Sequence, residues 1–158
     1  MGPALELLYL AVLSLWVGGI ATFTFLVTPA IFRSYGRDMA GQIVGKLFPG
    51  YFTSLLVLSV LALLLFLLLR TGRTGAAYWI SVALLLAAII VNTYVSFKLH
   101  PDAVRIKEQV TSFERGSPDS PARKEFRRLH AVSAALNLFV LLDGAVLIAL
   151  SRHLGRNS

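Results

Sequence analysis

Apolar residues run through this chain in four long stretches separated by polar segments, at residues 4–32, 51–69, 75–99 and 129–150. At a rise of about 1.5 Å per residue, each stretch is long enough, as a helix, to cross a hydrocarbon core of about 30 Å. A helix also satisfies its backbone hydrogen bonds internally, which lipid requires. The pattern therefore predicts an all-α fold, with a single integral membrane domain over residues 1–158 built as a four-transmembrane-helix bundle.

Two of the connecting segments have helical patterns of their own. Between residues 38 and 48 the apolar positions lie close to helical spacing, with Asp38 suited to the start and Pro49 to the end. Pro101 predicts that the third span breaks just before it and that a second helix begins there. We expect short amphipathic helices in these loops, the first of them lying on the membrane surface.

The first span carries a stripe of small residues, Ser14, Gly18 and Thr22, at four-residue spacing. Such stripes let a neighbouring helix approach closely. We therefore expect Gly18→Leu to disrupt the bundle.

Composition supports a membrane protein. The hydrophobic content is 56% and the mean hydropathy +0.73, too apolar for a soluble domain of 158 residues. There is no cysteine, which excludes disulfides and thiolate chemistry. The net charge of +7 lies mainly in the loops, so we interpret it as a topology signal and as contacts to anionic lipid headgroups, with no nucleic-acid partner.

The distribution of basic residues predicts the orientation. Eleven of the fifteen Lys and Arg residues lie in the first and third loops. The remaining four lie on the opposite side, at Arg70, Arg73, Arg152 and Arg156. The positive-inside rule then places the two basic loops in the cytoplasm and both termini outside, in a multi-pass protein of the cell (inner) membrane.

A few polar residues inside or near the spans are candidates for function, because polar groups within a membrane are costly. His130, Ser133 and Asn137 share one face of the fourth span, and Asn92 lies two turns deeper in the third span than His100. Since these spans are antiparallel, the two imidazoles are expected at the same depth, as a metal site or proton relay, with the other three residues as ligand-binding groups. The alternative is that the histidines lie at the headgroup boundary and the asparagines join helices.

Asp143 lies deeper in the fourth span and about 120° away from the face of Asn137. It is a further candidate ligand-binding residue. The structural alternative is a hydrogen bond to a neighbouring span, or to Arg70 or Arg73.

Several short motifs together resemble a known family. They are residues 15–19 (LWVGG), 29–32 (PAIF), 40–52 (AGQIVGKLFPGYF) and 126–133 (FRRLHAVS), followed by Asn137. Their order and spacing resemble the uncharacterised bacterial membrane-domain family typified by transmembrane protein 205. The resemblance covers nearly the whole chain and implies a four-span protein, with no family-wide biochemical activity.

The LWVGG start also resembles a wider superfamily that includes the CopD copper-resistance proteins and the HemJ-type protoporphyrinogen oxidase. Those relatives typically have a histidine in the first span, which suits haem or metal ligation. Here Tyr9 and Leu10 occupy that neighbourhood, so a metal ion is a better-supported cofactor than haem.

Three functional hypotheses stay open. The leading one is a non-enzymatic membrane protein that handles or senses a small ligand or metal ion. The others are a haem-binding membrane oxidoreductase and a structural or assembly subunit of a membrane complex. The small-residue stripe also allows a homo-oligomer.

Overall fold

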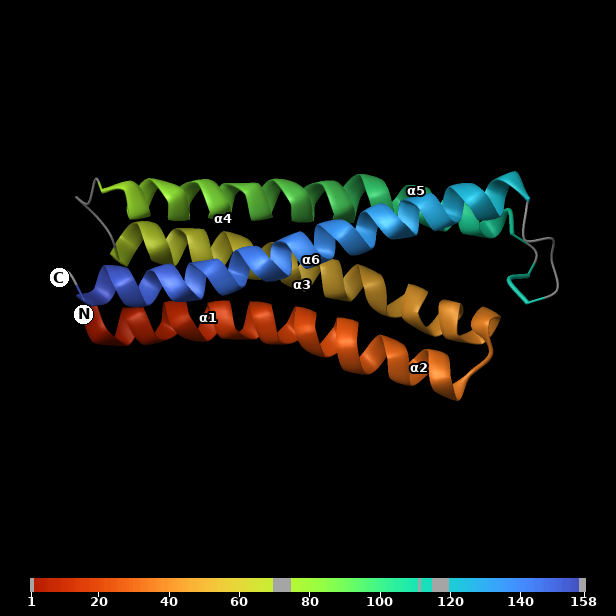
Figure 1. The fold of residues 1–158 in the computed structure, drawn as a ribbon, viewed down its shortest axis with the longest axis horizontal. Coiled ribbons are helices and arrows are strands. Elements are labelled where there is room, and N and C mark those ends of the chain that lie inside the picture. The colour runs from red at the N-terminus through yellow and green to blue at the C-terminus, as the bar shows by residue number, and fades with distance from the viewer. Residues whose placement is uncertain (1, 70–74, 111, 115–119, 157–158) are drawn as a thin grey trace.

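The computed structural model describes residues 2–69, 75–110, 112–114 and 120–156, except for the side chains beyond Ser151. The regular structure in these residues is helical and forms four long rods that run side by side (Figure 1). In chain order, the elements are α1 (Gly2–Thr22), the π-helical turn η1 (Phe23–Val27), α2 (Thr28–Ser34), α3 (Arg37–Leu69), α4 (Ala76–Tyr94), the π-helical turn η2 (Val95–Leu99), α5 (His100–Glu108) and α6 (Pro121–Arg156).

The rods alternate in direction, so both chain termini lie at one end of the bundle, called here the terminal end (Figure 1). The opposite end, called the loop end, contains the connections from α2 to α3 and from α5 to α6. The helix α1 packs against α3 and α6, and α4 packs against the same two helices. This is the arrangement of an up-and-down four-helix bundle, with α1 and α4 on one diagonal.

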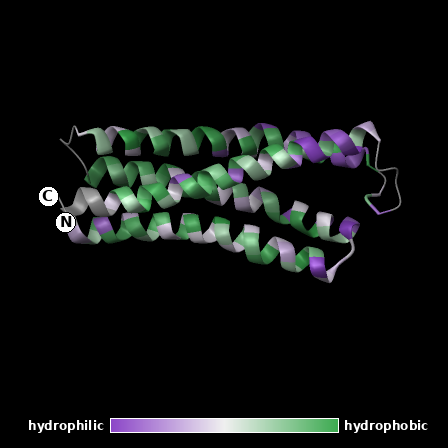
Figure 2. Ribbon diagram, in the orientation of Figure 1, coloured by the Kyte–Doolittle hydropathy of each residue, from purple (hydrophilic) through white to green (hydrophobic). Residues whose placement is uncertain are grey.

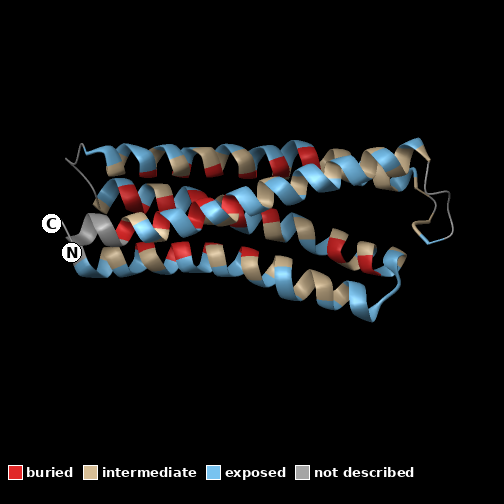
Figure 3. Ribbon diagram, viewed as in Figure 1, coloured by how far each residue is buried: buried red, intermediate tan, exposed pale blue. Residues whose placement is uncertain are grey.

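The core is packed most tightly in the half nearer the terminal end. The residues that are almost fully buried there come from all four rods: Leu13 and Trp16 from the first, then Phe66, Leu85 and Leu147. A smaller cluster nearer the loop end consists of Phe52, Val95 and Leu99. Figure 3 shows the buried positions along the inner faces of the helices. The loop half therefore contains less buried apolar packing than the terminal half.

Apolar residues occupy most of the length of the rods, and hydrophilic residues gather at the loop end (Figure 2). Leu7, Leu15, Ile90, Phe97 and Leu142 are each at least 65% exposed. Four helices are long and apolar enough to cross a membrane: Pro3–Ser34, Arg37–Leu69, Ala76–Glu108 and Pro121–Ser151. The all-α fold with four membrane-length helices is thus confirmed. Because each has 31 to 33 residues, about 46–50 Å of helix, their loop ends extend beyond a hydrocarbon core of about 30 Å.

The segment from 38 to 48 is not a separate surface helix, so that part of the sequence interpretation is wrong. It is the beginning of α3, which continues through Pro49 to Leu69. Ala40 and Val44 are buried in the bundle, on the stripe that continues through Phe52. Packing of this continuous face holds the helix together where proline removes one backbone hydrogen bond.

The third span also continues past the position where we expected a break. The backbone angles of Leu99 and His100 are both helical, and α5 follows η2 directly to Glu108. Pro101 does lie in the first turn of α5, as the sequence indicates. The helix accommodates the proline by widening into a π-helical turn instead of breaking.

The stripe of small residues on the first span faces outward. A Cβ added at Gly18 or Gly19 would meet no atom within 4 Å, so the close helix contact expected at Gly18 is not present within one copy of the chain. Gly144 of α6 is the tight position instead, because its Cβ would lie 2.7 Å from Val17 Cγ2 and 3.9 Å from Trp16 Cδ2. The contact between α1 and α6 therefore depends on a glycine of the fourth rod.

Candidate functional site

Two similar π-helical turns shape the loop half of the bundle. In the first, the Thr28 N–H bonds to the Phe23 carbonyl, and Pro29 follows. In the second, the His100 N–H bonds to the Val95 carbonyl, and Pro101 follows. Each proline lacks an N–H and crowds the carbonyl four residues before it, which the wider turn relieves. Turns of this kind are frequent at functional sites.

The sequences of the two turns are also alike, FTFLVTP at residues 23–29 and VSFKLHP at residues 95–101. Both have a hydroxyl residue in the second position, phenylalanine in the third and proline in the seventh. The similarity is confined to these seven residues. The structure places the two heptads at corresponding points of the first and third rods.

The histidine cavity, defined by His100, His130, Ser133, Lys107, Phe48 and Phe52 among its lining residues, lies between α3, α5 and α6. Its volume is about 70 Å³. His100 and His130 are both among its lining residues, although they lie 30 residues apart in sequence. Ser133 lines it one turn deeper than His130. That the two imidazoles come within reach of one metal ion stays a prediction.

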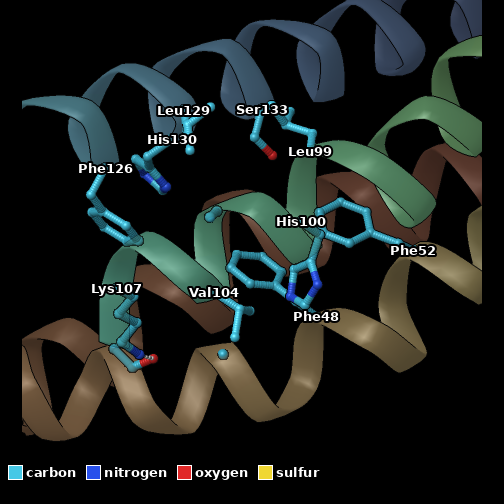
Figure 4. Close-up of a pocket in the computed structure, with 13 residues that line it drawn as sticks. Phe48, Phe52, Leu99, His100, Val104, Lys107, Phe126, Leu129, His130 and Ser133 are labelled. Atoms are coloured by element: carbon cyan, nitrogen blue, oxygen red, sulfur yellow. Dashed lines mark hydrogen bonds between the residues drawn. The ribbon is translucent and has the colours of Figure 1, made fainter. Parts of the chain in front are cut away.

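The two imidazoles lie on different walls of the cavity (Figure 4). The His100 ring contacts Phe48 and Phe52 edge-on, with centroids 5.8 and 5.7 Å apart. The His130 ring stacks on Phe126 at 6.3 Å. Among the described residues, no three His, Cys, Asp or Glu side chains group closely enough to hold a metal ion. An ion bound here would take its remaining ligands from the Ser133 hydroxyl or from water.

Lys107 is the one cationic side chain among the residues that line the histidine cavity. Its Nζ donates a 2.6 Å hydrogen bond to the Gly41 carbonyl of α3. Cβ atoms added at Gly41 and Gly45 would lie 3.6 and 3.4 Å from Nζ, at ordinary contact distances, so the ammonium lies directly beside this part of the α3 backbone. The ammonium therefore bridges α5 and α3 at the outer end of the cavity.

A larger space, called here the side cavity, lies between η1, α3 and α6. Its volume is about 300 Å³, and its lining includes Phe23, Thr24, Tyr51, Ala134 and Asn137. It shares four lining residues with the histidine cavity: Phe48, Phe52, His130 and Ser133. The two cavities thus have a common wall.

Asn137 lies at the centre of a hydrogen-bonded triad in the side cavity. Its Oδ1 accepts a 2.6 Å bond from the Tyr51 hydroxyl, and its Nδ2 donates a 2.9 Å bond to Thr24 Oγ1. The Tyr51 ring also stacks on Phe23 with centroids 4.3 Å apart. The triad joins three rods at a point where little apolar packing does so.

Asn92 is buried away from the histidine cavity. Its Nδ2 donates to the Leu55 carbonyl and to Ser59 Oγ, both at 3.5 Å, which joins α4 to α3. Together with Ser133 and Asn137, it also lines a void of about 10 Å³. These contacts agree with the alternative in which Asn92 joins two helices.

Asp143 is separate from both cavities and is only 4% exposed. Neither carboxyl oxygen has a hydrogen-bond partner in the part of the chain that the structure describes. The proposed partners Arg70 and Arg73 lie outside the described residues. The structure therefore does not bring Asp143 together with the other candidate site residues.

A clasp at the loop end joins the segment after α5 to the start of α3. Asp38 accepts hydrogen bonds from Ser112 Oγ and from the Phe113 N–H, both at 2.6 Å. Arg123 of α6 donates to the Phe113 carbonyl, and its guanidinium lies 5.5 Å from the Phe113 ring centre. The Ser112 hydroxyl, followed by the Phe113 N–H, lowers the pKa of the Asp38 carboxyl, which lies beyond the apolar stretch of α3.

Sequence reasoning missed several residues of this region, including Thr24, Phe48, Tyr51, Phe52 and Lys107. The first four lie on helix faces, and only the packing of the bundle decides which residues of the other rods these faces contact. Lys107 was counted only as a topology signal. The one available signal was Tyr51, an amphipathic ring at the start of an apolar stretch, where a polar partner is common.

Comparisons with known proteins identify the family. The family described as "Domain of unknown function (DUF4149)" matches residues 11–112, a range that contains His100 and Lys107 and ends before α6. An uncharacterized protein of Aquifex aeolicus (strain VF5) is 31% identical over 152 residues, covering 94% of this chain and 98% of that protein. No solved structure matches.

Neither description includes an activity, a ligand or a cofactor. The finer resemblance to transmembrane protein 205, and to the CopD and HemJ proteins, therefore stays a prediction. The family model and the relative each match most of the chain, and the chain therefore belongs to the DUF4149 family.

Proposed function

We propose that this protein binds a small ligand in the histidine cavity, and that a transition-metal ion is the ligand its donor set fits best. The observation that carries the proposal is that His100 and His130, from different rods, line one cavity. Imidazole is a common ligand of zinc, copper and nickel, and the Ser133 hydroxyl is an oxygen donor in the same lining.

The size of the cavity favours an ion over haem. A volume of about 70 Å³ holds an ion with a few water molecules, whereas a haem is far larger. The first rod also lacks a histidine, and Tyr9 is buried against Phe66 in that neighbourhood. We further propose that the loop end faces the cytoplasm, so that the cavity takes its ligand from that side.

The test is metal binding by the purified full-length protein in detergent or nanodiscs, measured by equilibrium dialysis with Zn²⁺ and with Cu⁺. His100→Ala and His130→Ala are each expected to weaken binding at least about tenfold, since even the loss of a supporting residue costs that much at metal sites. His153→Ala is the matched control, because this third histidine lies at the far end of α6. Unchanged binding in the double His100→Ala, His130→Ala variant would overturn the proposal.

The sign of the ligand's charge can be tested at Lys107. Lys107→Met removes a positive charge from the cavity lining and is expected to tighten the binding of a cation. Weaker binding of Zn²⁺ or Cu⁺ in this variant would contradict a cation site that Lys107 repels. An absorption spectrum separates the haem alternative, because a Soret band that disappears in His130→Ala would favour haem over a metal ion.

A further inference from the structure

The side cavity has features of a second binding site, distinct from the histidine cavity. It is about four times larger by volume, about 300 Å³ against about 70 Å³. Known ligand pockets begin at about this size, are mostly apolar, and contain a few polar groups that orient the ligand. Aromatic and aliphatic residues make up most of the lining, which places the Tyr51–Asn137–Thr24 triad in apolar surroundings.

The cavity opens sideways, between the first rod and α6. Its rim includes Phe25 and Leu138, which are 57% and 43% exposed, and the exposed Ala134. Beyond η1 the first rod diverges from α6, and α2 packs on α3 instead (Figure 1). These rim residues lie in membrane-length apolar helices, so the surroundings of the opening are acyl chains and not water. An occupant of this site therefore enters from the bilayer.

The polar lining selects an uncharged headgroup. None of the described lining residues is Asp, Glu, Lys or Arg. Apart from the His130 imidazole, the lining offers no group that could supply a countercharge, so an ionised headgroup would lose its hydration there with little compensation, which is costly. The hydroxyl and amide side chains of Thr24, Tyr51, Ser133 and Asn137 are instead suited to a carbonyl or hydroxyl group. Asn137 has a second N–H, and the Tyr51 oxygen has acceptor capacity, beyond the bonds they make to each other.

We propose that the side cavity binds an uncharged amphiphile from the bilayer, with a carbonyl or hydroxyl head at the Tyr51–Asn137–Thr24 triad. Its chain leaves between η1 and α6 into the membrane. The inference goes beyond the proposed metal site, with which it shares a wall at Phe48, Phe52, His130 and Ser133. The Tyr51 ring, stacked on Phe23, is a flat apolar surface beside the headgroup.

Photolabelling of the full-length protein in nanodiscs tests the proposal. The probe is a monoacylglycerol with a diazirine near its head, and labelled peptides are identified by mass spectrometry. Labels are expected within residues 23–28 and 130–138, and unlabelled monoacylglycerol is expected to displace them. The corresponding ionised fatty acid is expected to label these segments much less. Equal labelling by the two probes would contradict the uncharged headgroup.

Two neighbouring alanines of α6 give a matched pair of variants. Ala134 lines the side cavity and Ala135 does not, and both are exposed, so that a phenylalanine at either position has room outside the core. Ala134→Phe is expected to reduce specific labelling at least about tenfold by filling the cavity. Ala135→Phe is expected to leave it unchanged. Equal labelling of the two variants would overturn the proposal.

Asn137→Leu removes the centre of the triad and is expected to reduce labelling as well. Its thermal unfolding is measured alongside, because Asn137 also joins three rods. Metal dialysis on the same proteins separates this proposal from the first. Loss of labelling in Ala134→Phe with metal binding intact supports the side cavity alone, whereas His100→Ala is expected to weaken metal binding and keep the labelling.

Discussion

At Gly144, α6 leaves no room for a side chain. The Cβ atom of any other residue would approach the Val17 methyl to 2.7 Å, with the buried Trp16 ring behind it. Valine is stiff about its first side-chain torsion, so neither neighbour moves away easily. A single residue thus sets the distance between the first and fourth rods.

Gly144→Ala is therefore expected to destabilise the protein by about 1–3 kcal/mol, the usual cost of overpacking. Gly18→Ala is the control, since a Cβ there meets nothing within 4 Å. The measurement is thermal unfolding of the purified protein in one detergent. A larger loss for Gly18→Ala would show that its outward face is covered by another copy of the chain.

At the scale of elements, the loop end is held mainly by polar contacts. The clasp from Asp38 to Ser112 and Phe113 joins α3 to the segment after α5, and Lys107 joins α5 to α3. The apolar cluster at this end is small. The histidine cavity and the side cavity lie in the same half of the bundle, so their shape depends on these few contacts.

The clasp is expected to be sensitive to acid. Because its hydrogen bonds lower the pKa of Asp38 below the usual 3.8, their contribution is complete well above that value and is lost as the pH falls through the lowered pKa. Asp38→Asn removes the carboxylate and is expected to loosen the clasp already at neutral pH. Hydrogen exchange at the Phe113 amide measures both effects, and protection that is unchanged in Asp38→Asn would contradict this role. Asp102→Asn is the control, because that carboxylate pairs locally with Lys98 on the same rod.

At the scale of the whole molecule, the even number of rods places both termini at one end (Figure 1). In the sequence, eleven of the fifteen basic residues belong to the first and third loops, which connect the rods at the loop end. The positive-inside rule therefore predicts that the termini face out and that both cavities lie in the cytoplasmic half of the membrane.

Reporter fusions at Ser158 measure this orientation. A reporter that is active only outside the cytoplasm is expected to be active, and one that requires the cytoplasm is expected to be silent. The opposite pattern would reverse the charge-based topology, and the histidine cavity would then open to the outside.

The sequence by itself determined the four membrane helices, because long apolar stretches have few alternatives in lipid. It also indicated that His100 and His130 lie at one depth, because antiparallel spans joined by loops bring their adjacent ends together. What it could not decide was the continuity of each helix at proline. Pro49 and Pro101 read locally as helix boundaries, whereas packing of a buried stripe and a π-helical turn keep both helices continuous.

Only the tertiary structure decided which faces meet. The stripe at Gly18 is open and Gly144 is the close contact, because rotation of each helix about its axis is set by neighbours that lie far away in sequence. The same rotations separate Asp143 from the cavities and bring Tyr51 and Thr24 to Asn137. Hydrogen bonds between side chains of different rods depend on these rotations, and a periodic apolar pattern does not encode them.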